Sequence, residues 1–219
     1  MKFKISNASA EVLKQKLSLI LEKDKNSYYS DGSYLIKSLY FDDRDSTSYY
    51  EKMDGVLYRK KYRIRIYNND YTFIRLEKKM KHNNYTAKEQ MLISKDIYSK
   101  ILNGKIEEIN DAEGLLLEFI NDYKTKGLIP SIIVEYHRIA FTYQISDVRI
   151  TFDSNIQSGL YNYDLFNENY PKYNVVGDGK QVLEVKFNEI LPLHIANILN
   201  DIPSSREAIS KFAVCRSIK

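Results

Sequence analysis

One alternating stretch, from Tyr58 to Tyr67, constrains the fold more than any other part of the chain. Its tyrosines and isoleucines favour a β-strand, in which neighbouring side chains point to opposite faces of the sheet. A strand over Lys61–Tyr67 therefore has one cationic and one apolar face. The cationic face carries Lys61, Arg63 and Arg65, and the apolar face carries Tyr62, Ile64 and Ile66.

Two later stretches, Thr72–Lys79 and Val182–Phe187, repeat this alternation. Their polar faces carry Arg75, Glu77 and Lys79 in the first and Glu184 and Lys186 in the second. An antiparallel sheet with one face in water shows the same pattern, so alternation alone does not indicate a function.

The density of positive charge gives the stronger signal. Residues 59–88 contain ten Lys or Arg and only two acids, which is a net charge of +8 in a chain whose total is +4. Like charges at this density repel one another and destabilise the folded state unless an anion neutralises them. The sequence therefore predicts a densely negative ligand.

The chain has 219 residues, of which 43% are hydrophobic, and can bury a substantial core. Few prolines and glycines and no obvious linker favour a single domain over residues 1–219. No run of about 18 apolar residues is present, and the first residues lack the apolar core of a signal peptide. We therefore expect a cytoplasmic protein without a membrane segment. Its single cysteine, Cys215, excludes an internal disulfide.

The pattern of elements predicts an α+β fold with an antiparallel sheet. Eight strands are expected, at Lys2–Ile5, Ser33–Asp42, Lys61–Tyr67, Thr72–Lys79, Tyr85–Ile93, Ser131–Tyr143, Val148–Asp153 and Val182–Phe187. Eight strands can close into a barrel. If the polar faces point inward and helices cover the apolar outside, the interior is a cation-lined tunnel, and a helix over about 205–218 closes the chain.

Such a tunnel would gather most of the strand cations around one cavity. These are Lys2, Arg63, Arg65, Arg75, Lys79, Lys88, Arg138, Arg149 and Lys186. Glu77 and Glu184 would be isolated acids among them. Each could hold Mg²⁺ or Mn²⁺ together with phosphate oxygens of a ligand, or could simply neutralise a neighbouring cation. The residues alone leave both interpretations open.

Six ordered motifs resemble the VTC domain of polyphosphate polymerases, which belong to the triphosphate tunnel metalloenzymes. The motifs are Tyr58–Tyr67, Arg75–Lys79, Tyr136–Phe141, Val148–Asp153, Leu183–Phe187 and Ser210–Phe212, and they span essentially the whole chain. The resemblance implies a closed antiparallel tunnel that binds nucleoside triphosphate and polyphosphate with a divalent metal, Mn²⁺ or Mg²⁺. It also implies that the C-terminal helix closes or plugs this tunnel.

The same resemblance implies roles for individual residues. The expected phosphate ligands are Arg63, Arg65, Lys79, Lys88, Arg138 and Lys211, with Arg149 as a further cation of the wall. Lys2 matches the lysine of the family's first strand, and Glu184 matches the metal ligand. Bacterial relatives carry Arg-x-Glu just before that lysine, and the sequence printed here begins at Met1.

The implied reaction is transfer of the γ-phosphate of ATP to a growing polyphosphate chain, held by metal and cations. Two alternatives remain open. Water could replace the acceptor, which would make the protein a triphosphate hydrolase, or the domain could bind polyphosphate or nucleotide without catalysis.

Other ligand classes fit the sequence less well. No G-x-x-x-x-G-K-S/T motif indicates a P-loop enzyme. The three histidines lack the spacing of zinc ligands, and inward-facing cations could not reach a nucleic-acid duplex. A membrane-embedded partner that places the protein at the inner face of a membrane remains compatible with the sequence.

Overall fold

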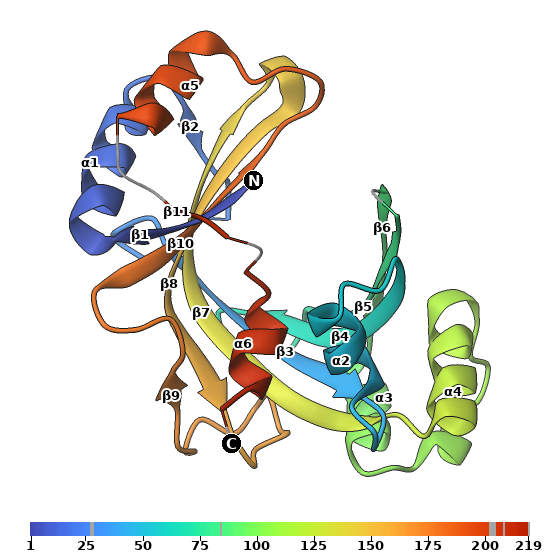
Figure 1. Cartoon of the computed structure of the whole chain (residues 1–219). Coiled ribbons are helices and arrows are strands. Elements are labelled where there is room, and N and C mark those ends of the chain that lie inside the picture. The colour runs from blue at the N-terminus through green and yellow to red at the C-terminus, as the bar shows by residue number, and fades with distance from the viewer. Residues whose placement is uncertain (27–28, 84, 202–204, 208, 219) are drawn as a thin grey trace. The chain divides into compact units, whose positions relative to one another are not determined.

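The computed structural model describes residues 1–26, 29–83, 85–201, 205–207 and 209–218 (Figure 1). These residues form two compact units, each assembled from three separate segments of the chain. The first unit comprises Met1–Leu35, Tyr136–Ile156 and Asn174–Ser210, and the second comprises Ile36–Glu135, Gln157–Tyr173 and Lys211–Lys219. The expected strands are divided between these two units.

In the first unit, strands β1 (Lys2–Ser6), β10 (Lys180–Lys186) and β8 (Val148–Gly159) pair antiparallel in that order. Helices α1 (Asn7–Ser18) and α5 (Leu193–Asn200) lie side by side in Figure 1. Their buried side chains, among them Leu13, Leu17 and Ile195, share one hydrophobic cluster with apolar side chains of these strands. Each such buried side chain contributes about 1.5–3 kcal/mol to folding.

In the second unit, β3 (Tyr34–Asp42) pairs with β4 (Tyr58–Tyr67), β4 with β5 (Ile74–His82) and β5 with β6 (Tyr85–Ile93), all antiparallel. The apolar faces of these strands share a core with α3 (Lys95–Leu102) and α4 (Gly114–Lys126). Tyr62, Ile64 and Ile66 lie in that core, as the alternation predicts.

Of the remaining described elements, β7 (Ile129–Tyr143) contributes residues to both units, and the others are short. These others are β2 (Glu22–Lys23), α2 (Thr47–Met53), β9 (Tyr173–Asn174), β11 (Ser205–Arg206), α6 (Lys211–Arg216) and 3₁₀ turns at Ile106–Glu108 and Ile145–Asp147. The strand order is β11-β1-β10-β8-β7-β3-β4-β5-β6, with β2 on β7 and β9 on β8.

The structure confirms the α+β class and the antiparallel pairing, and it corrects the expected closure. All eight expected strands are present, and three two-residue strands join them in one eleven-stranded sheet. Among the described residues, no hydrogen-bonded pairing joins β6 to β11 or β1, so the sheet is not a closed eight-stranded barrel. Closure requires a matching register between the two edge strands, which strand alternation alone does not specify.

The C-terminal helix is shorter than expected. Instead of a helix over 205–218, residues 205–206 form β11, which pairs with Phe3 and Lys4 of β1, and α6 covers only Lys211–Arg216. Residue 208 and residue 219 lie outside the described part of the chain. Backbone pairing with β1 replaces the first helical turns here.

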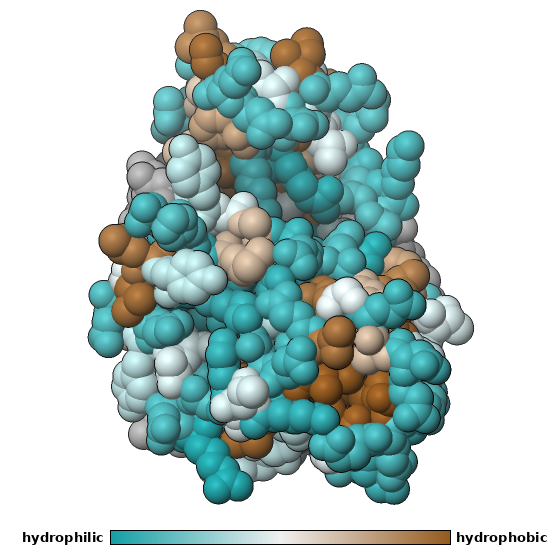
Figure 2. Space-filling model, turned by 90° about the vertical axis from the view of Figure 1, so that its right-hand side faces the viewer, coloured by the Kyte–Doolittle hydropathy of each residue, from teal (hydrophilic) through white to brown (hydrophobic). Residues whose placement is uncertain are grey.

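The surface in Figure 2 is mostly hydrophilic, and hydrophobic side chains gather on it in small patches. Within the described residues, no helix combines the length and the apolar character needed to cross a membrane.

Candidate functional site

The second unit gathers most of the predicted cations on one sheet face. The cationic face, as we call it, consists of the side chains of Lys61, Arg63, Arg65, Arg75, Glu77, Lys79 and Lys88, which share one side of strands β4–β6. The strand register places Arg65 opposite Arg75 and Lys79 opposite both Lys61 and Lys88. Like charges directly opposite one another destabilise a sheet, so the arrangement requires negative charge nearby.

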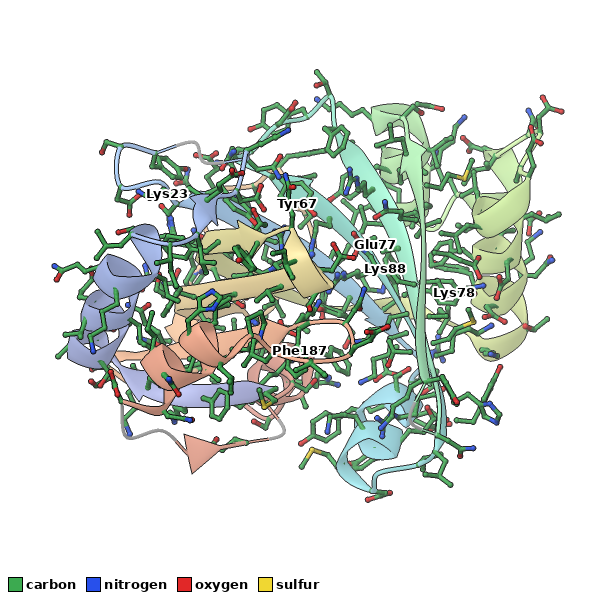
Figure 3. All side chains as sticks on the ribbon, turned by 90° about the horizontal axis from the view of Figure 1, so that it is seen from above. Lys23, Tyr67, Glu77, Lys78, Lys88 and Phe187 are labelled. Atoms are coloured by element: carbon green, nitrogen blue, oxygen red, sulfur yellow. The ribbon has the colours of Figure 1, made fainter. Side chains whose placement is uncertain are left out.

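Glu77 supplies part of that negative charge. Its side chain is only 1% exposed, and one carboxylate oxygen lies 2.6 Å from Arg63 Nε and 2.5 Å from Arg63 Nη2. The other oxygen lies 2.7 Å from Lys88 Nζ. Burial alone would raise the pKa of Glu77, but Arg63, Arg65 and Lys88 outweigh it and lower the pKa to about 2. Figure 3 shows Glu77 and Lys88 close together on one side of the β5–β6 hairpin.

Strand β3 fixes the two arginines of the central motif. Arg63 Nη1 donates to the Tyr40 hydroxyl at 2.8 Å, and Arg65 Nε donates to Ser38 Oγ at 2.9 Å. Arg65 is buried, with 6% of its surface exposed. Hydrogen bonds to these neutral partners fix the orientation of both guanidinium groups, and Arg63 is also paired with Glu77.

The other predicted residues of this unit differ in their surroundings. The Arg75 guanidinium lies over the Phe73 ring, 4.4 Å from its centroid. Lys79 is exposed, and Lys211 is the first residue of α6. Lys88 also donates to Gln90 at 3.1 Å.

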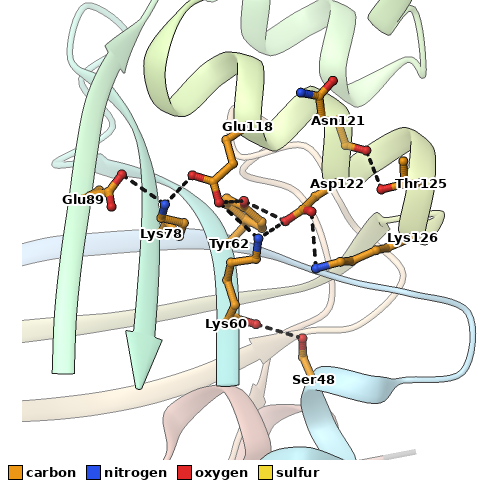
Figure 4. A network of polar contacts seen from close by, with 10 residues as sticks. All are labelled: Ser48, Lys60, Tyr62, Lys78, Glu89, Glu118, Asn121, Asp122, Thr125 and Lys126. Atoms are coloured by element: carbon orange, nitrogen blue, oxygen red, sulfur yellow. Dashed lines mark hydrogen bonds and ion pairs between the residues drawn. The ribbon is translucent and has the colours of Figure 1, made fainter. Parts of the chain in front are cut away.

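Not every cation of this basic stretch faces the same way. Lys60 and Lys78 lie on the opposite side of the sheet, where they pair with Glu118 and Asp122 of α4 (Figure 4). The Tyr62 hydroxyl lies 2.8 Å from Asp122 and 3.1 Å from Glu118, so it can donate to either acid. Lys78 also lies 3.1 Å from Glu89. These lysines are neutralised within the fold, so they attach α4 to the sheet and are not part of the cationic face.

The first unit holds the other predicted residues on a second polar face. The register places Glu184 opposite Lys2 on one side and Thr151 on the other, and places Lys186 opposite Arg149. Glu184 lies 3.8 Å from Lys186 Nζ, and Lys2 Nζ donates to the Ile209 carbonyl at 2.9 Å. Glu184 therefore lies beside Lys186 and opposite Lys2 in the register.

Two arginines of this unit are paired with acids that the sequence analysis did not assign to the site. Arg138 donates to both oxygens of Asp153, at 2.6 and 2.8 Å, and Asp153 is fully buried. Arg149 lies 2.5 Å from Asp24 and donates to the Tyr34 hydroxyl at 3.2 Å. Burial opposes the charge of Arg138, but the Asp153 carboxylate outweighs burial and raises the pKa of Arg138 further. A bidentate pair of this kind fixes the guanidinium geometry strongly.

The acids differ in their fit to a divalent metal. The described residues contain no group of three or more His, Cys, Asp or Glu side chains that could hold a metal by themselves. Both Glu77 oxygens already contact cations, which favours the neutralising role left open for it. Glu184 can offer a single carboxylate, so Mg²⁺ or Mn²⁺ there would need phosphate oxygens as further ligands.

The structure thus sorts the predicted residues into two groups. Arg63, Arg65, Arg75, Glu77, Lys79, Lys88 and Lys211 belong to the second unit, and Lys2, Arg138, Arg149, Glu184 and Lys186 belong to the first. Their convergence on one cavity stays a prediction. Sequence reasoning missed Ser38 and Tyr40 as partners of the arginines. Alternation along β3 already placed both on one face and was the available signal, whereas nothing in the sequence indicated Asp24.

One of three comparisons with known proteins, the family model, agrees with the motif pattern. The model of the VTC domain matches residues 1–218. No curated protein matches the chain. Among solved structures, a candidate adenylate cyclase from Bacillus halodurans is 13% identical, covers 91% of this chain and 85% of its own, and has a TM-score of 0.49. Two Pyrococcus horikoshii proteins are also 13% identical to this chain. PH1012 covers 92% of this chain and 87% of its own, with a TM-score of 0.43. PH1819 covers 91% of this chain and 84% of its own, with a TM-score of 0.42.

Proposed function

Because this chain belongs to the VTC domain family, we propose that it binds polyphosphate and nucleoside triphosphate and transfers the terminal phosphate of ATP to a polyphosphate chain. The match spans residues 1–218 and therefore includes both units. It agrees with the six motifs that indicated the same family from the sequence. The activity itself is our inference from the chemistry of the polar faces.

The observation that carries the proposal is that cations stand directly opposite one another at three positions of the cationic face. Arg65 opposes Arg75, and Lys79 opposes both Lys61 and Lys88. Glu77 is the acid of this face, and it pairs with Arg63 and Lys88. Opposed like charges cost roughly 0.2–1 kcal/mol for each pair. A chain of phosphates has about one negative charge per phosphate and could contact several of these cations at once. It would convert this repulsion into charge-assisted hydrogen bonds.

The chain's own residues would act by binding and orientation. Arg63 and Arg65 are oriented by Tyr40 and Ser38. They would bind nonbridging oxygens of the phosphate groups and stabilise the negative charge that develops during transfer. Glu184 would hold Mg²⁺ or Mn²⁺ together with phosphate oxygens, and the bound ion would supply further neutralisation of the transferred group. Phosphoryl transfer of this type depends on positioning and electrostatics, so it requires no covalent intermediate on the protein.

The decisive experiment incubates the purified protein with ATP and Mn²⁺, with and without a short polyphosphate primer. Products are resolved by gel, and released phosphate is measured in parallel. We expect primer extension that Arg65→Ala and Glu184→Gln abolish. Lys124→Ala is the matched control, because Lys124 forms only an exposed ion pair with Glu107 on the helical side, and this variant should extend primer normally.

The alternatives give different results in the same assay. Phosphate release without polymer growth would identify a hydrolase that uses the same cations. Polyphosphate binding without turnover in either metal would identify a binding module. Absence of any binding to ATP or polyphosphate would refute the proposal.

A further inference from the structure

Lys61 differs from every other charged residue of the cationic face. Its Nζ is buried, and within the described part of the chain it has no hydrogen-bond partner and no ion pair. Its opposite neighbour on β5 is another cation, Lys79. A buried ammonium without a hydrogen-bond partner is costly to fold. Lys61 thus places a buried positive charge that lacks a hydrogen-bond acceptor two residues from Arg63.

The acids near Lys61 do not give its ammonium a hydrogen-bond acceptor. The acid of β3 is Asp42, whose carboxylate accepts from the backbone N–H groups of Asp43, Ser48 and Tyr49 at 3.0, 2.8 and 3.1 Å. These hydrogen bonds orient the carboxylate towards the start of α2, and its negative charge acts on Lys61 through space. Burial lowers the pKa of Lys61 to about 8; Asp42 and Glu51 raise it, whereas Arg59 and Lys52 lower it further.

The aromatic ring of Phe212 covers the Lys61 ammonium. Lys61 Nζ lies 4.1 Å from the ring centroid, and the same ring packs against Tyr40, the hydrogen-bond partner of Arg63. A cation–π contact stabilises an ammonium by about 2 kcal/mol when it is desolvated. It lacks the directed acceptors that three ammonium protons require. The ring therefore protects the charge from water and leaves its hydrogen-bonding capacity unused.

We propose that Lys61 is an additional phosphate ligand of the cationic face, and that the Phe212 ring covers it until an anion arrives. This inference rests on the proposed function, because its ligand is an oxygen of the same polyphosphate chain. Lys61 is two residues from Arg63 on the same face of β4, and it opposes Lys79. A phosphate between Lys61 and Lys79 would neutralise two opposed cations and give Lys61 the acceptors that it lacks.

The test measures the affinity of the full chain for tripolyphosphate by titration calorimetry, and its stability by urea unfolding at pH 7. We expect Lys61→Met to weaken tripolyphosphate binding about 10- to 100-fold, the range for loss of a hydrogen bond to a charged group. We also expect Lys61→Met to unfold at the same or a higher urea concentration than the wild type, because it removes an unpaired buried charge.

A structural role for Lys61 makes the opposite prediction. If Lys61→Met unfolds at lower urea concentration and the folded variant binds tripolyphosphate as the wild type does, the proposal is wrong. Phe212→Leu keeps an apolar side chain but removes the ring, so it should bind tripolyphosphate at least as tightly as the wild type. Weaker binding by this variant would refute the covering role of the ring.

Arg65→Ala separates this inference from the proposed function. If the wild type binds tripolyphosphate and Arg65→Ala weakens the binding while Lys61→Met does not, only the role of Lys61 fails. If the wild type does not bind tripolyphosphate at all, both the proposed function and the role of Lys61 fail.

Discussion

Replacing Glu77 with glutamine removes a buried negative charge from the cationic face while keeping the shape of the side chain. In the wild type, Glu77 contacts Arg63 and Lys88 and is 1% exposed. The variant leaves both cations without this carboxylate. Breaking a buried ion pair by removing one partner typically costs about 3–5 kcal/mol. We therefore expect Glu77→Gln to destabilise the fold strongly at neutral pH.

The size of the effect follows from the pKa of Glu77. The pKa falls from an ordinary 4.5 to about 2 in the folded protein. Each pKa unit corresponds to about 1.4 kcal/mol, so the ionised carboxylate contributes about 3 kcal/mol above pH 4.5. Because the folded-state pKa is lowered, this contribution disappears as the pH falls from 4.5 towards 2. At pH 3, about 1 kcal/mol remains.

Urea titrations of wild type and Glu77→Gln at pH 7 and pH 3 measure this contribution directly. The difference in unfolding free energy between the two proteins should shrink by about 2 kcal/mol at the lower pH. Glu89→Gln is the matched control, because Glu89 lies on the same hairpin but is 50% exposed beside Lys78 and should cost at most about 1 kcal/mol. A Glu77→Gln effect below 1 kcal/mol at pH 7, or one that is equal at both pH values, would refute this reasoning.

Three further predictions concern other charged groups. Asp153→Asn should destabilise the protein by about 3–5 kcal/mol, because it leaves the Arg138 guanidinium without its anionic partner; an unchanged urea midpoint would contradict this. Lys61 loses its proton as the pH rises through about 8, so wild-type affinity for tripolyphosphate should fall up to about tenfold between pH 7 and 9, whereas Lys61→Arg should lack this part of the decrease. Mn²⁺ should strengthen tripolyphosphate binding by the wild type but not by Glu184→Gln, with equal affinities in the absence of metal; the same Mn²⁺ effect in both proteins would exclude Glu184 as the metal ligand.

Strand alternation was enough to predict which residues share a face. It placed Arg63 and Arg65 on the face opposite Ile64 and Ile66, and the structure shows the arginines there and the isoleucines in the core. The reason is that the two-residue period of a strand is local. The excess of positive charge over residues 59–88 did not separate the two faces in the same way, because Lys60 and Lys78 lie on the opposite side and pair with Glu118 and Asp122. The family could be identified from the motifs because they occur in order along the chain.

Partners on other strands could not be predicted in the same way. The face of a residue follows from its own strand, but its neighbours depend on register and on long-range pairing. The sequence around Asp153 therefore did not indicate that this residue would bind Arg138 from the preceding strand. The prediction of a C-terminal helix over 205–218 was wrong for a related reason. Backbone pairing of residues 205–206 with Phe3 and Lys4 overrides local helix propensity.

The interleaving of the two units has a consequence for biosynthesis. The last segment of the second unit contains Phe212, whose ring covers a lysine on β4, and Cys215, whose carbonyl accepts from Ser158. The first unit likewise joins Lys2 to the carbonyl of Ile209. Neither unit can therefore be completed while the ribosome still holds the end of the described chain. Contacts so distant in sequence slow folding, so the nascent chain must keep its apolar strands from aggregating until residues 209–218 have been synthesised.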